Sequence, residues 1–349
     1  MRFILEYARE GRNYLITLLV LAVMVLGLLF YLGAPVGGST SPVMVIVPQG
    51  ATAAKVGCKL KEVGLVRSAF GFSVIARARE DASKLKPGAY LFNRSMSVRR
   101  MLDAMVHGDI AAVWVTVPEG FTAQQLARRL ADKRLVNENE FLTLVTACAG
   151  DFKDIVSVPS SGLEGYLFPD TYLVPLNASP REIVTQMLKT FKSQVADPMS
   201  SEIEQIAGGS DAESKGEALN RIIIVASLIE REARVPKDRT LISAVIWNRL
   251  RIGMKLDIDA TVQYALGGHR KRLYYKDLAV ESPYNTYIHP GLPPGPIANP
   301  GIESIKAALH PEKADYLYYV ARTDGSHIFS RTLSEHDAAI NRLRKGGRP

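Results

Sequence analysis

Two glutamates near the end of one apolar segment are the residues best suited to acid–base chemistry. Glu230 and Glu232 follow the run Ile222-Ile-Ile-Val-Ala-Ser-Leu-Ile and precede Pro236, which predicts a helix that ends just after them. At about 100° per residue, positions two apart point to nearly opposite sides of a helix. The two carboxylates are therefore not a cooperating pair, and each must be interpreted from its own neighbours.

The residues one turn away distinguish the two glutamates. Glu230 precedes Arg234 by four residues, a spacing that predicts a surface ion pair and a charged carboxylate. Glu232 has the apolar Leu228 and Ile229 one turn back. A desolvated carboxyl group favours its protonated form, which is the form that a general acid needs. The alternative is that both glutamates are solvated at a fraying helix end.

A second stretch combines carboxylates with aromatic rings. Glu164 and Asp170 lie within Gly162-Leu-Glu-Gly-Tyr-Leu-Phe-Pro-Asp-Thr-Tyr, which also carries Tyr166, Phe168 and Tyr172. Aromatic rings stack on sugars while acids bind hydroxyl groups, so the composition suits a saccharide. The alternative is an aromatic-rich turn that caps a core.

Further polar side chains lie on two short helices and one long loop beyond Pro236. Asp238 is placed to cap a helix that carries Asn248, and Asp259 is placed to cap a short helix that carries Gln263. Residues 282–301 predict a long loop rich in Pro and Gly. Rigid loops of this kind often form the wall of a binding cleft.

An apolar segment near the N-terminus predicts a membrane span. Residues 14–34 carry no charge and are long enough to cross a bilayer as a helix. Arg2, Arg9 and Arg12 precede this segment, and the next charged residue is Lys55, so residues 1–13 are expected in the cytoplasm and the bulk of the chain outside. The segment is longer than the core of a usual signal peptide, which favours an uncleaved anchor over a cleaved leader.

Composition narrows the classes of partner and chemistry. The chain has 349 residues, enough for two or three domains, and a formal net charge of +8. Its Lys and Arg are spread along the sequence without interleaved aromatics, which favours a polyanion such as a cell wall over nucleic acid. Cys58 and Cys148 are expected as buried free thiols, although a disulfide is permitted outside the cell. The six histidines lack metal-ligand spacing, so no metal is predicted, and no cofactor is predicted either. No nucleophile-elbow motif occurs, so the sequence does not predict a serine or cysteine nucleophile.

A sequence motif occurs twice in the region after the predicted membrane span. Val43-Met-Val-Ile-Val-Pro-Gln-Gly-Ala-Thr-Ala is echoed by Val113-Trp-Val-Thr-Val-Pro-Glu-Gly-Phe-Thr-Ala. Each copy predicts a strand, a turn and a threonine that caps a helix. Near the C-terminus the pattern predicts a helix, a hairpin over Thr323-Asp-Gly-Ser and a closing helix. The predicted organisation is a flexible linker at 35–42, a small α+β module at 43–110, a second strand–turn–helix region at 111–215 and a catalytic domain at 216–346.

Together, these motifs resemble the MltG/YceG family of endolytic murein transglycosylases. The resemblance rests on Ala226-Ser-Leu-Ile-Glu-Arg-Glu-Ala, Asn248-Arg-Leu-Arg-Ile-Gly-Met, Asp259-Ala-Thr-Val, Tyr284-Asn-Thr-Tyr and Gly291-Leu-Pro-Pro-Gly-Pro-Ile, and it covers nearly the whole chain. It implies an α+β protein with one N-terminal transmembrane helix, a LysM-like peptidoglycan-binding module and a mixed α/β catalytic domain with a lysozyme-like cleft built on a single glutamate. It also implies an inner-membrane protein with its catalytic domain in the periplasm, acting on peptidoglycan beside peptidoglycan synthases.

The resemblance implies a lyase that cleaves the β-1,4 bond between N-acetylmuramic acid and N-acetylglucosamine. The family's catalytic glutamate falls on Glu232, the residue that its local surroundings also favour. It would protonate the leaving oxygen and then accept the proton of the muramyl 6-hydroxyl, giving a 1,6-anhydro end, in a reaction expected to terminate nascent strands. The candidate substrate-binding residues are Asn285, Tyr287, Asn248, Gln263, Glu164 and Tyr166.

Two other functions remain open at this point. One is a noncatalytic scaffold that holds glycan strands in the same cleft. The other is a muramidase that uses water, with Asp257, Asp259 or Glu281 as its second carboxylate.

Overall fold

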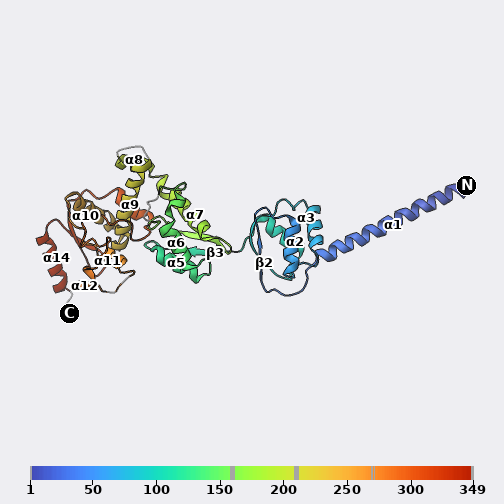
Figure 1. Cartoon of the computed structure of the whole chain (residues 1–349), viewed down its shortest axis with the longest axis horizontal. Coiled ribbons are helices and arrows are strands. Elements are labelled where there is room, and N and C mark those ends of the chain that lie inside the picture. Colours follow the sequence, from blue (N-terminus) through green and yellow to red (C-terminus); the bar gives the residue numbers. More distant parts are fainter. Residues whose placement is uncertain (1, 158–161, 208–211, 269, 271, 347–349) are drawn as a thin grey trace. The chain divides into compact units, whose positions relative to one another are not determined.

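The chain forms two compact units in the computed structural model, which describes residues 2–157, 162–207, 212–268, 270 and 272–346 (Figure 1). The first unit contains Met1–Val113 with Leu173–Asn177, and the second contains Trp114–Tyr172 with Ala178–Pro349. Both combine helices with short strands, so the predicted α+β class is confirmed. The second strand–turn–helix region lies largely in the same unit as the predicted catalytic residues.

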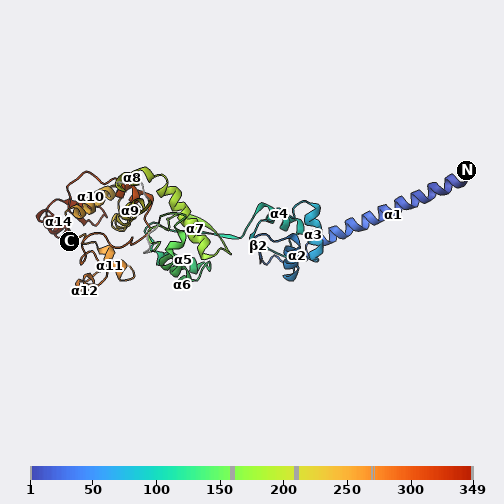
Figure 2. The same ribbon diagram turned by 45° about the horizontal axis from the view of Figure 1, so that its top comes forward.

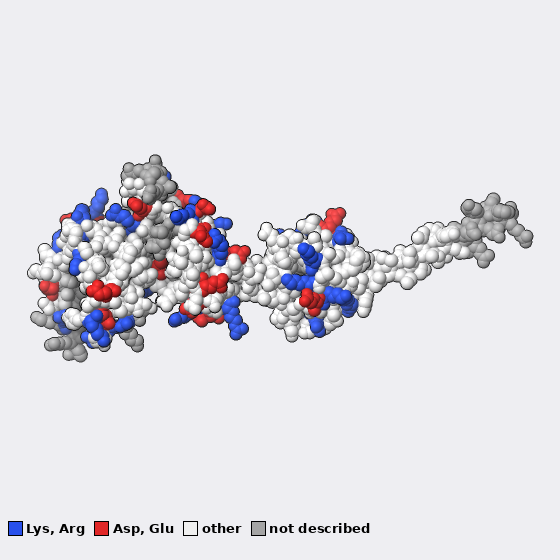
Figure 3. Space-filling model, viewed as in Figure 1, with Lys and Arg blue, Asp and Glu red and all other residues white. Residues whose placement is uncertain are grey.

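The first unit begins with the long helix α1 (Arg2–Gly33). Its segment Asn13–Gly33 is long and apolar enough to cross a membrane, which agrees with the predicted span to within one residue. Figure 3 shows no charged side chain along this segment. The arginines that predict its orientation, Arg2, Arg9 and Arg12, have side chains outside the described part of the chain.

A small α+β module follows α1. Strands β1 and β2 pair antiparallel, with Val43 opposite Phe92 and Val47 opposite Gly88. Alternate residues of β1 face the core, and Leu60, Phe72 and Tyr90 are fully buried there. The elements are β1 (Val43–Val47), α2 (Ala53–Glu62), α3 (Ala69–Ala78), β2 (Gly88–Phe92) and α4 (Val98–His107).

The segment between α1 and β1 is attached to this module. Gly37 donates its backbone N–H to Arg94 at 3.0 Å, and Ser95 donates its own to Ser39 at 3.2 Å. The flexible linker at 35–42 stays a prediction, and these two bonds attach residues 37 and 39 within it to the turn before α4.

The two copies of the repeated motif form the same local structure. Thr52 caps α2, and Thr122 caps α5 with a full capping box. Gly50 and Gly120 precede them with φ of 71° and 74°, a left-handed conformation that glycine adopts without strain. The predicted pair of strand–turn–helix modules is confirmed.

Helix α9 is the centre of the second unit, and α8, α10, α11 and α13 pack against it (Figures 1 and 2). Its residues 222–229 are all buried. The polar, Gly-rich composition of residues 207–217 predicts a surface loop before this helix. That prediction is wrong where described, because α9 already begins at Ala212; residues 208–211 lie outside the described part. The helices are α5 (Ala123–Asp132), α6 (Glu138–Ala147), α7 (Pro180–Phe191), α8 (Ser200–Ala207), α9 (Ala212–Glu232), α10 (Arg239–Arg251), α11 (Asp259–Ala265), α12 (Tyr275–Leu278), α13 (Ile302–Leu309) and α14 (Leu333–Gly346).

Short strands and single helical turns complete the chain. Strands β3 and β4 form one two-stranded sheet, and β5 and β6 form the predicted C-terminal hairpin. Residues 279–301 form a loop without helix or strand, as predicted. The remaining elements are β3 (Ala112–Thr116), η1 (Ala149–Phe152), β4 (Thr171–Pro175), η2 (Lys192–Ala196), η3 (Pro236–Asp238), β5 (Tyr318–Ala321) and β6 (His327–Ser330).

Both cysteines are unbonded thiols, but the expectation that both are buried is wrong. Cys58 is exposed on α2, and Cys148 is half-buried after α6.

Candidate active site

Glu232 is the last residue of α9, where the buried helix reaches a cavity. Its carboxylate accepts a hydrogen bond from the Tyr319 hydroxyl at 3.2 Å and another from the backbone N–H of Ala260, at the start of α11. Burial raises the pKa of Glu232 from its ordinary 4.5 to about 7, and the negative charge of Asp259 adds to the rise, whereas the two hydrogen bonds oppose it. The site therefore holds a carboxyl group that can both donate and accept a proton near neutral pH.

The cavity in front of Glu232 has a volume of about 470 Å³ and a lining of carboxylates, aromatic rings and basic side chains. Tyr287 lies in this lining and donates its hydroxyl proton to Asp259 at 2.6 Å. Burial and the Asp259 carboxylate raise the pKa of Tyr287, so it stays a neutral hydroxyl. The other lining residues are Arg249, Leu256, Asp257, Tyr318, Tyr319, Val320, Ala321, His327, Leu333 and His336.

Buried hydrogen bonds position the elements around this cavity. Thr286 accepts the Ile258 N–H at 3.0 Å, which fixes the loop before Tyr287 against the start of α11. Arg249 donates to the backbone carbonyls of Leu317 and Leu256 at 2.6 and 2.8 Å. It thereby links α10 to the segments that precede β5 and α11.

Asp238 takes part in the same scaffold rather than in a helix cap. Its carboxylate accepts the backbone N–H of His327 at 2.7 Å and lies 2.9 Å from His327 Nδ1. It makes no side-chain cap for α10, so the predicted capping role is wrong. The competing partner lies 89 residues away in β6, beyond the reach of a local pattern.

Glu230 lies on a different side of α9 and binds the start of α13. It accepts the backbone N–H of Gly301 at 3.1 Å and the Ser304 hydroxyl at 2.7 Å. The described residues contain no ion pair between Glu230 and Arg234, so that prediction is wrong. The unpartnered N–H groups at the beginning of α13 are the stronger attraction.

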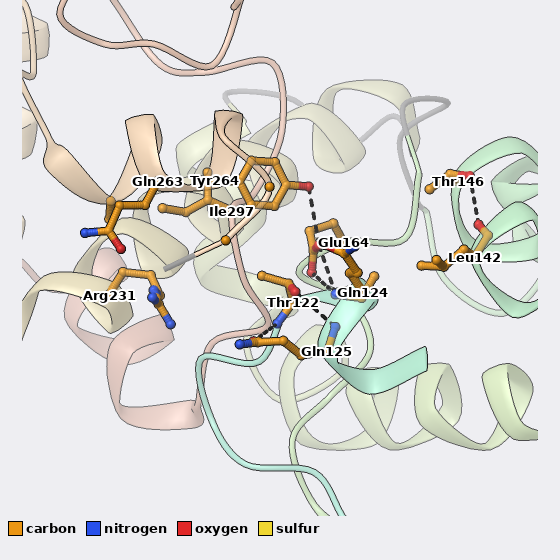
Figure 4. A pocket seen from close by; sticks show the side chains of 14 residues that line it. Thr122, Gln124, Gln125, Leu142, Thr146, Glu164, Arg231, Gln263, Tyr264 and Ile297 are labelled. Atoms are coloured by element: carbon orange, nitrogen blue, oxygen red, sulfur yellow. Dashed lines mark hydrogen bonds between the residues drawn. The ribbon is translucent and has the colours of Figure 1, made fainter. Parts of the chain in front are cut away.

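A second cavity, of about 330 Å³, is lined by residues of α5, α6, α9 and α11 and of the loops beside them (Figure 4). Arg231 and Ala260, the immediate neighbours of Glu232 and Asp259, both line it. Gln263 and Tyr264 of α11 also line it, together with hydroxyl and amide side chains around the start of α5. In each of the neighbouring pairs 231–232 and 259–260, one residue therefore lines the first cavity and the other lines the second.

Glu164 is a carboxylate in the lining of this second cavity (Figure 4). It accepts hydrogen bonds from the Ala123 N–H at 3.0 Å, the Asn299 amide at 3.0 Å and the Tyr264 hydroxyl at 3.3 Å. Burial raises the pKa of Glu164 to about 7, and these hydrogen bonds oppose the rise. Its carboxylate therefore joins the start of α5, α11 and the loop before α13.

Asn248 and Asn285 are interior residues that fix the backbone. The Asn285 amide donates to the carbonyls of Leu278 and Val280, both at 2.9 Å, and its oxygen accepts the Tyr287 N–H at 3.0 Å. Asn248 donates to the carbonyls of Ala314 and Tyr316 at 2.7 and 3.0 Å. Neither is among the described residues that line the two cavities, so the structure gives both a positioning role.

Tyr166 is also a core residue, and so are the other aromatic rings of its stretch. Tyr166 is fully buried, packs 5.1 Å from the ring centre of Phe191 and donates to Asn220 at 3.1 Å. Phe168 and Tyr172 are buried as well. The alternative of an aromatic-rich turn within a core therefore applies, and of this stretch Glu164 alone is among the described residues that line either of the two cavities.

Sequence patterns miss Tyr319 and Asn299. Tyr319 lies on β5, and the only local sign of its role is a tyrosine pair in a strand that also supplies Tyr318 to the cavity. Asn299 is fully buried; its oxygen accepts the N–H groups of Gly165 and Leu167, and its amide donates to Phe121 and Glu164. Among the described residues no group of three or more His, Cys, Asp or Glu side chains is arranged for a metal ion.

The fold and site define an α+β protein with an N-terminal apolar helix and a half-buried carboxyl group, Glu232, that lines a cavity. The sequence profile of the YceG-like family matches residues 45–342, and the chain belongs to this family.

Similar proteins include curated enzymes and a crystal structure. An endolytic murein transglycosylase of Bacillus subtilis strain 168 is 34% identical over 317 residues, covering 86% of this chain and 84% of that protein. Another, from Streptococcus pneumoniae serotype 2 strain D39, is 28% identical over 328 residues, covering 85% of this chain and 58% of that protein. The crystal structure of a yceG-like protein from Listeria monocytogenes matches with a TM-score of 0.59 and 33% identity, covering 86% of this chain and all of that one.

Proposed function

We propose that this chain is a peptidoglycan lytic transglycosylase whose single catalytic acid and base is Glu232. The family and its curated murein transglycosylase relatives give the enzyme class, a lyase that acts on peptidoglycan. The observation that supports the residue is the half-buried Glu232 carboxyl group, with a pKa of about 7, facing a cavity large enough for sugar rings.

The reaction needs one group that donates a proton and then takes one back. Glu232 in its acid form protonates the glycosidic oxygen as the bond from that oxygen to the muramyl anomeric carbon breaks. The resulting carboxylate accepts the proton of the muramyl 6-hydroxyl as that oxygen bonds to the anomeric carbon. The product is a 1,6-anhydro end, no water is consumed, and Glu232 returns to its acid form. The tethered hydroxyl needs little loss of entropy to react.

Neighbouring groups tune this proton transfer. Tyr319 and the Ala260 N–H orient the carboxyl group, while Asp259 lies near enough to raise its pKa. Asp259 also fixes the hydroxyl of Tyr287 within the cavity. The negative charge of Asp259 would stabilise the positive charge that develops on the sugar ring in the transition state.

The two cavities support a path for the glycan strand on both sides of Glu232. Tyr287 contacts the strand in the larger cavity, and Gln263 and Glu164 line the part of the path in the second one. Hydroxyl and amide linings suit the hydroxyl and acetamido groups of such a strand. Such a path would form the single-glutamate cleft that the family resemblance implies.

The second candidate is a muramidase that uses water. Asp257 and Asp259 line the same cavity as Glu232, and a second carboxylate is what hydrolysis requires. Glu281, the third carboxylate considered from sequence, is exposed and is not among the described lining residues. The Asp259 carboxylate already accepts the Tyr287 hydroxyl, which favours its positioning role.

Product analysis tests both functions. Full-length protein in detergent is incubated with isolated murein sacculi, and the released fragments are analysed by mass spectrometry. Anhydro ends are expected; reducing ends would establish the hydrolase instead. Glu232→Gln should release nothing, and Glu230→Gln is the matched control two residues away that should retain cleavage. Loss of activity in Glu230→Gln with full activity in Glu232→Gln would overturn the assignment of the acid.

The reaction would take place at the outer side of the membrane that anchors the chain. The apolar helix supports a single-pass anchor, and the charge asymmetry around it supports a catalytic unit in the periplasm. The order β1–α2–α3–β2, with its two strands paired, supports a LysM-like glycan-binding role for the first module. Cleavage close to the membrane would terminate nascent strands beside the synthases that make them.

A further inference from the structure

The end of α1 packs directly against the first module. Gly71 of α3 lies against Leu32, so closely that a Cβ at this position would be 2.9 Å from Leu32 Cδ1. Gly33 lies against Ile75 of α3, with a corresponding distance of 3.4 Å. Because α1 and this module belong to one compact unit, no free spacer separates the apolar helix from α3.

Arg67 binds the C-terminal end of α1 to the first module. Its guanidinium donates to the carbonyls of Tyr31, Ala34 and Pro35 at 3.1, 2.7 and 2.7 Å, and it lies 4.6 Å from the centre of the Tyr31 ring. The last carbonyls of a helix lack partners within the helix, and the negative end of the helix dipole attracts a cation. Arg67 therefore caps α1 from the module side.

The length of the apolar segment determines where the contact between α1 and α3 would lie relative to a bilayer. Asn13–Gly33 has 21 residues, and at about 1.5 Å per residue it matches a hydrocarbon core of about 30 Å. Tyr14 and Tyr31 lie near its two ends, where aromatic side chains meet the lipid headgroups. With α1 across a bilayer, as the proposed function has it, α3 would lie at the level of that second interface, because it packs on Leu32.

The outer face of α3 combines apolar side chains with one basic side chain. Phe70 is 76% exposed, Val74 is half-buried and Ala78 is exposed, and the exposed Arg77 lies on the same side of the helix as Phe70, where it can pair with lipid phosphates. We propose that this face of α3 lies on the membrane surface, with Phe70 inserted among the phospholipids of the bilayer that α1 spans. The first unit is then docked on the membrane rather than tethered above it.

Depth-dependent fluorescence quenching tests this docking. Full-length Phe70→Trp, with Trp114→Phe and Trp247→Phe to remove the native fluorophores, is reconstituted into vesicles of phosphatidylethanolamine and phosphatidylglycerol. Lipids brominated on the acyl chains are present in both leaflets, so the orientation of insertion does not matter. Emission at position 70 should shift to shorter wavelength and be quenched by the bromolipids, while an aqueous quencher should have little effect.

Leu91→Trp in the same background is the matched control. Leu91 is also exposed and apolar, on β2, which lies farther from α1 than α3 does in both ribbon views (Figures 1 and 2). Its emission should respond to the aqueous quencher and not to the bromolipids. Equal responses at positions 70 and 91 would overturn the proposal. Adding Arg67→Ala to Phe70→Trp should lower the bromolipid quenching, because the cap that holds α3 at the interface is lost.

Discussion

At the scale of single residues, Glu232 and Glu230 show how position on one helix separates two carboxylates. Glu232 faces a cavity with Tyr319, whereas Glu230 binds Gly301 and Ser304 of another helix. The angular argument from sequence predicts this separation. The partner of Glu230 comes from a segment 71 residues away, which no local spacing can reveal.

The pH dependence of cleavage should report the protonation of Glu232. Its pKa of about 7 means that the acid form is lost as pH rises through that value, so kcat/KM should fall about tenfold per pH unit above it. Asp259→Asn keeps an acceptor for Tyr287 but removes a negative charge, so the falling limb should move to lower pH. The measurement is turnover of a defined glycan across pH, and an unchanged limb in Asp259→Asn would contradict the coupling.

Glu232 should also reduce stability at high pH. The folded protein holds this proton more tightly than the unfolded chain, so the free energy of unfolding falls as pH rises from about 4.5 to about 7 and stays lower above. Glu232→Gln removes that loss and should be about 1–2 kcal/mol more stable than the wild type at pH 8. Urea unfolding at pH 5 and pH 8 checks this, since the difference should be smaller at pH 5.

Glu230 should matter for stability rather than for chemistry. Ser304→Ala removes one hydrogen bond to Glu230 and should lower the free energy of unfolding by about 1 kcal/mol. Glu230→Ala removes both bonds and should cost about 2–3 kcal/mol, with cleavage per folded molecule largely retained. Denaturant unfolding and sacculus digestion are measured on the same samples, and loss of cleavage without loss of stability would oppose this role.

At the scale of elements, the second cavity depends on one buried amide. Asn299 makes four side-chain hydrogen bonds that join the turn before α5, the 164–167 segment and the loop before α13. Asn299→Leu keeps the volume but leaves buried N–H and C=O groups unpaired, so it should lower the free energy of unfolding by about 3 kcal/mol or more. Asn137→Ala, which removes an exposed helix cap, should cost only about 1 kcal/mol in the same unfolding measurement.

Elements with strong local signals are predictable from the sequence, and this covers much of the fold. The capping threonines, the strand repeat and the C-terminal hairpin all follow from residues a few positions apart. Strand β4 and the start of α9 are missed, because an aromatic-rich stretch and a polar segment take structures that tertiary packing decides.

Part of the candidate site can likewise be predicted from the sequence. Glu232, Tyr287, Gln263 and Glu164 reach cavities, whereas Asn248, Asn285 and Tyr166 are used inside the protein. A polar side chain in a motif has the same sequence signature in either role. Only the long-range partners, such as Ala314 and Tyr316 for Asn248, show which role applies.

At the scale of the whole molecule, charge should contribute to retention on the cell wall. The net charge is +8, and on the face drawn in Figure 3 basic and acidic side chains lie on both units. Attraction to a polyanionic wall would then be diffuse and screened by salt, since the Debye length falls from about 10 Å at 0.1 M to about 3 Å at 1 M. Contacts with neutral sugars inside the cavities would persist.

We therefore expect two components in the binding of Glu232→Gln full-length protein to isolated sacculi. Co-sedimentation in detergent should weaken several-fold as salt rises from about 0.1 M to about 1 M, and then level off instead of vanishing. Chitin, an uncharged glycan of N-acetylglucosamine, is the matched control, and binding to it should change little with salt. Binding to sacculi that does not respond to salt would show that charge adds nothing, whereas complete loss at high salt would leave no role for the cavities in holding the strand.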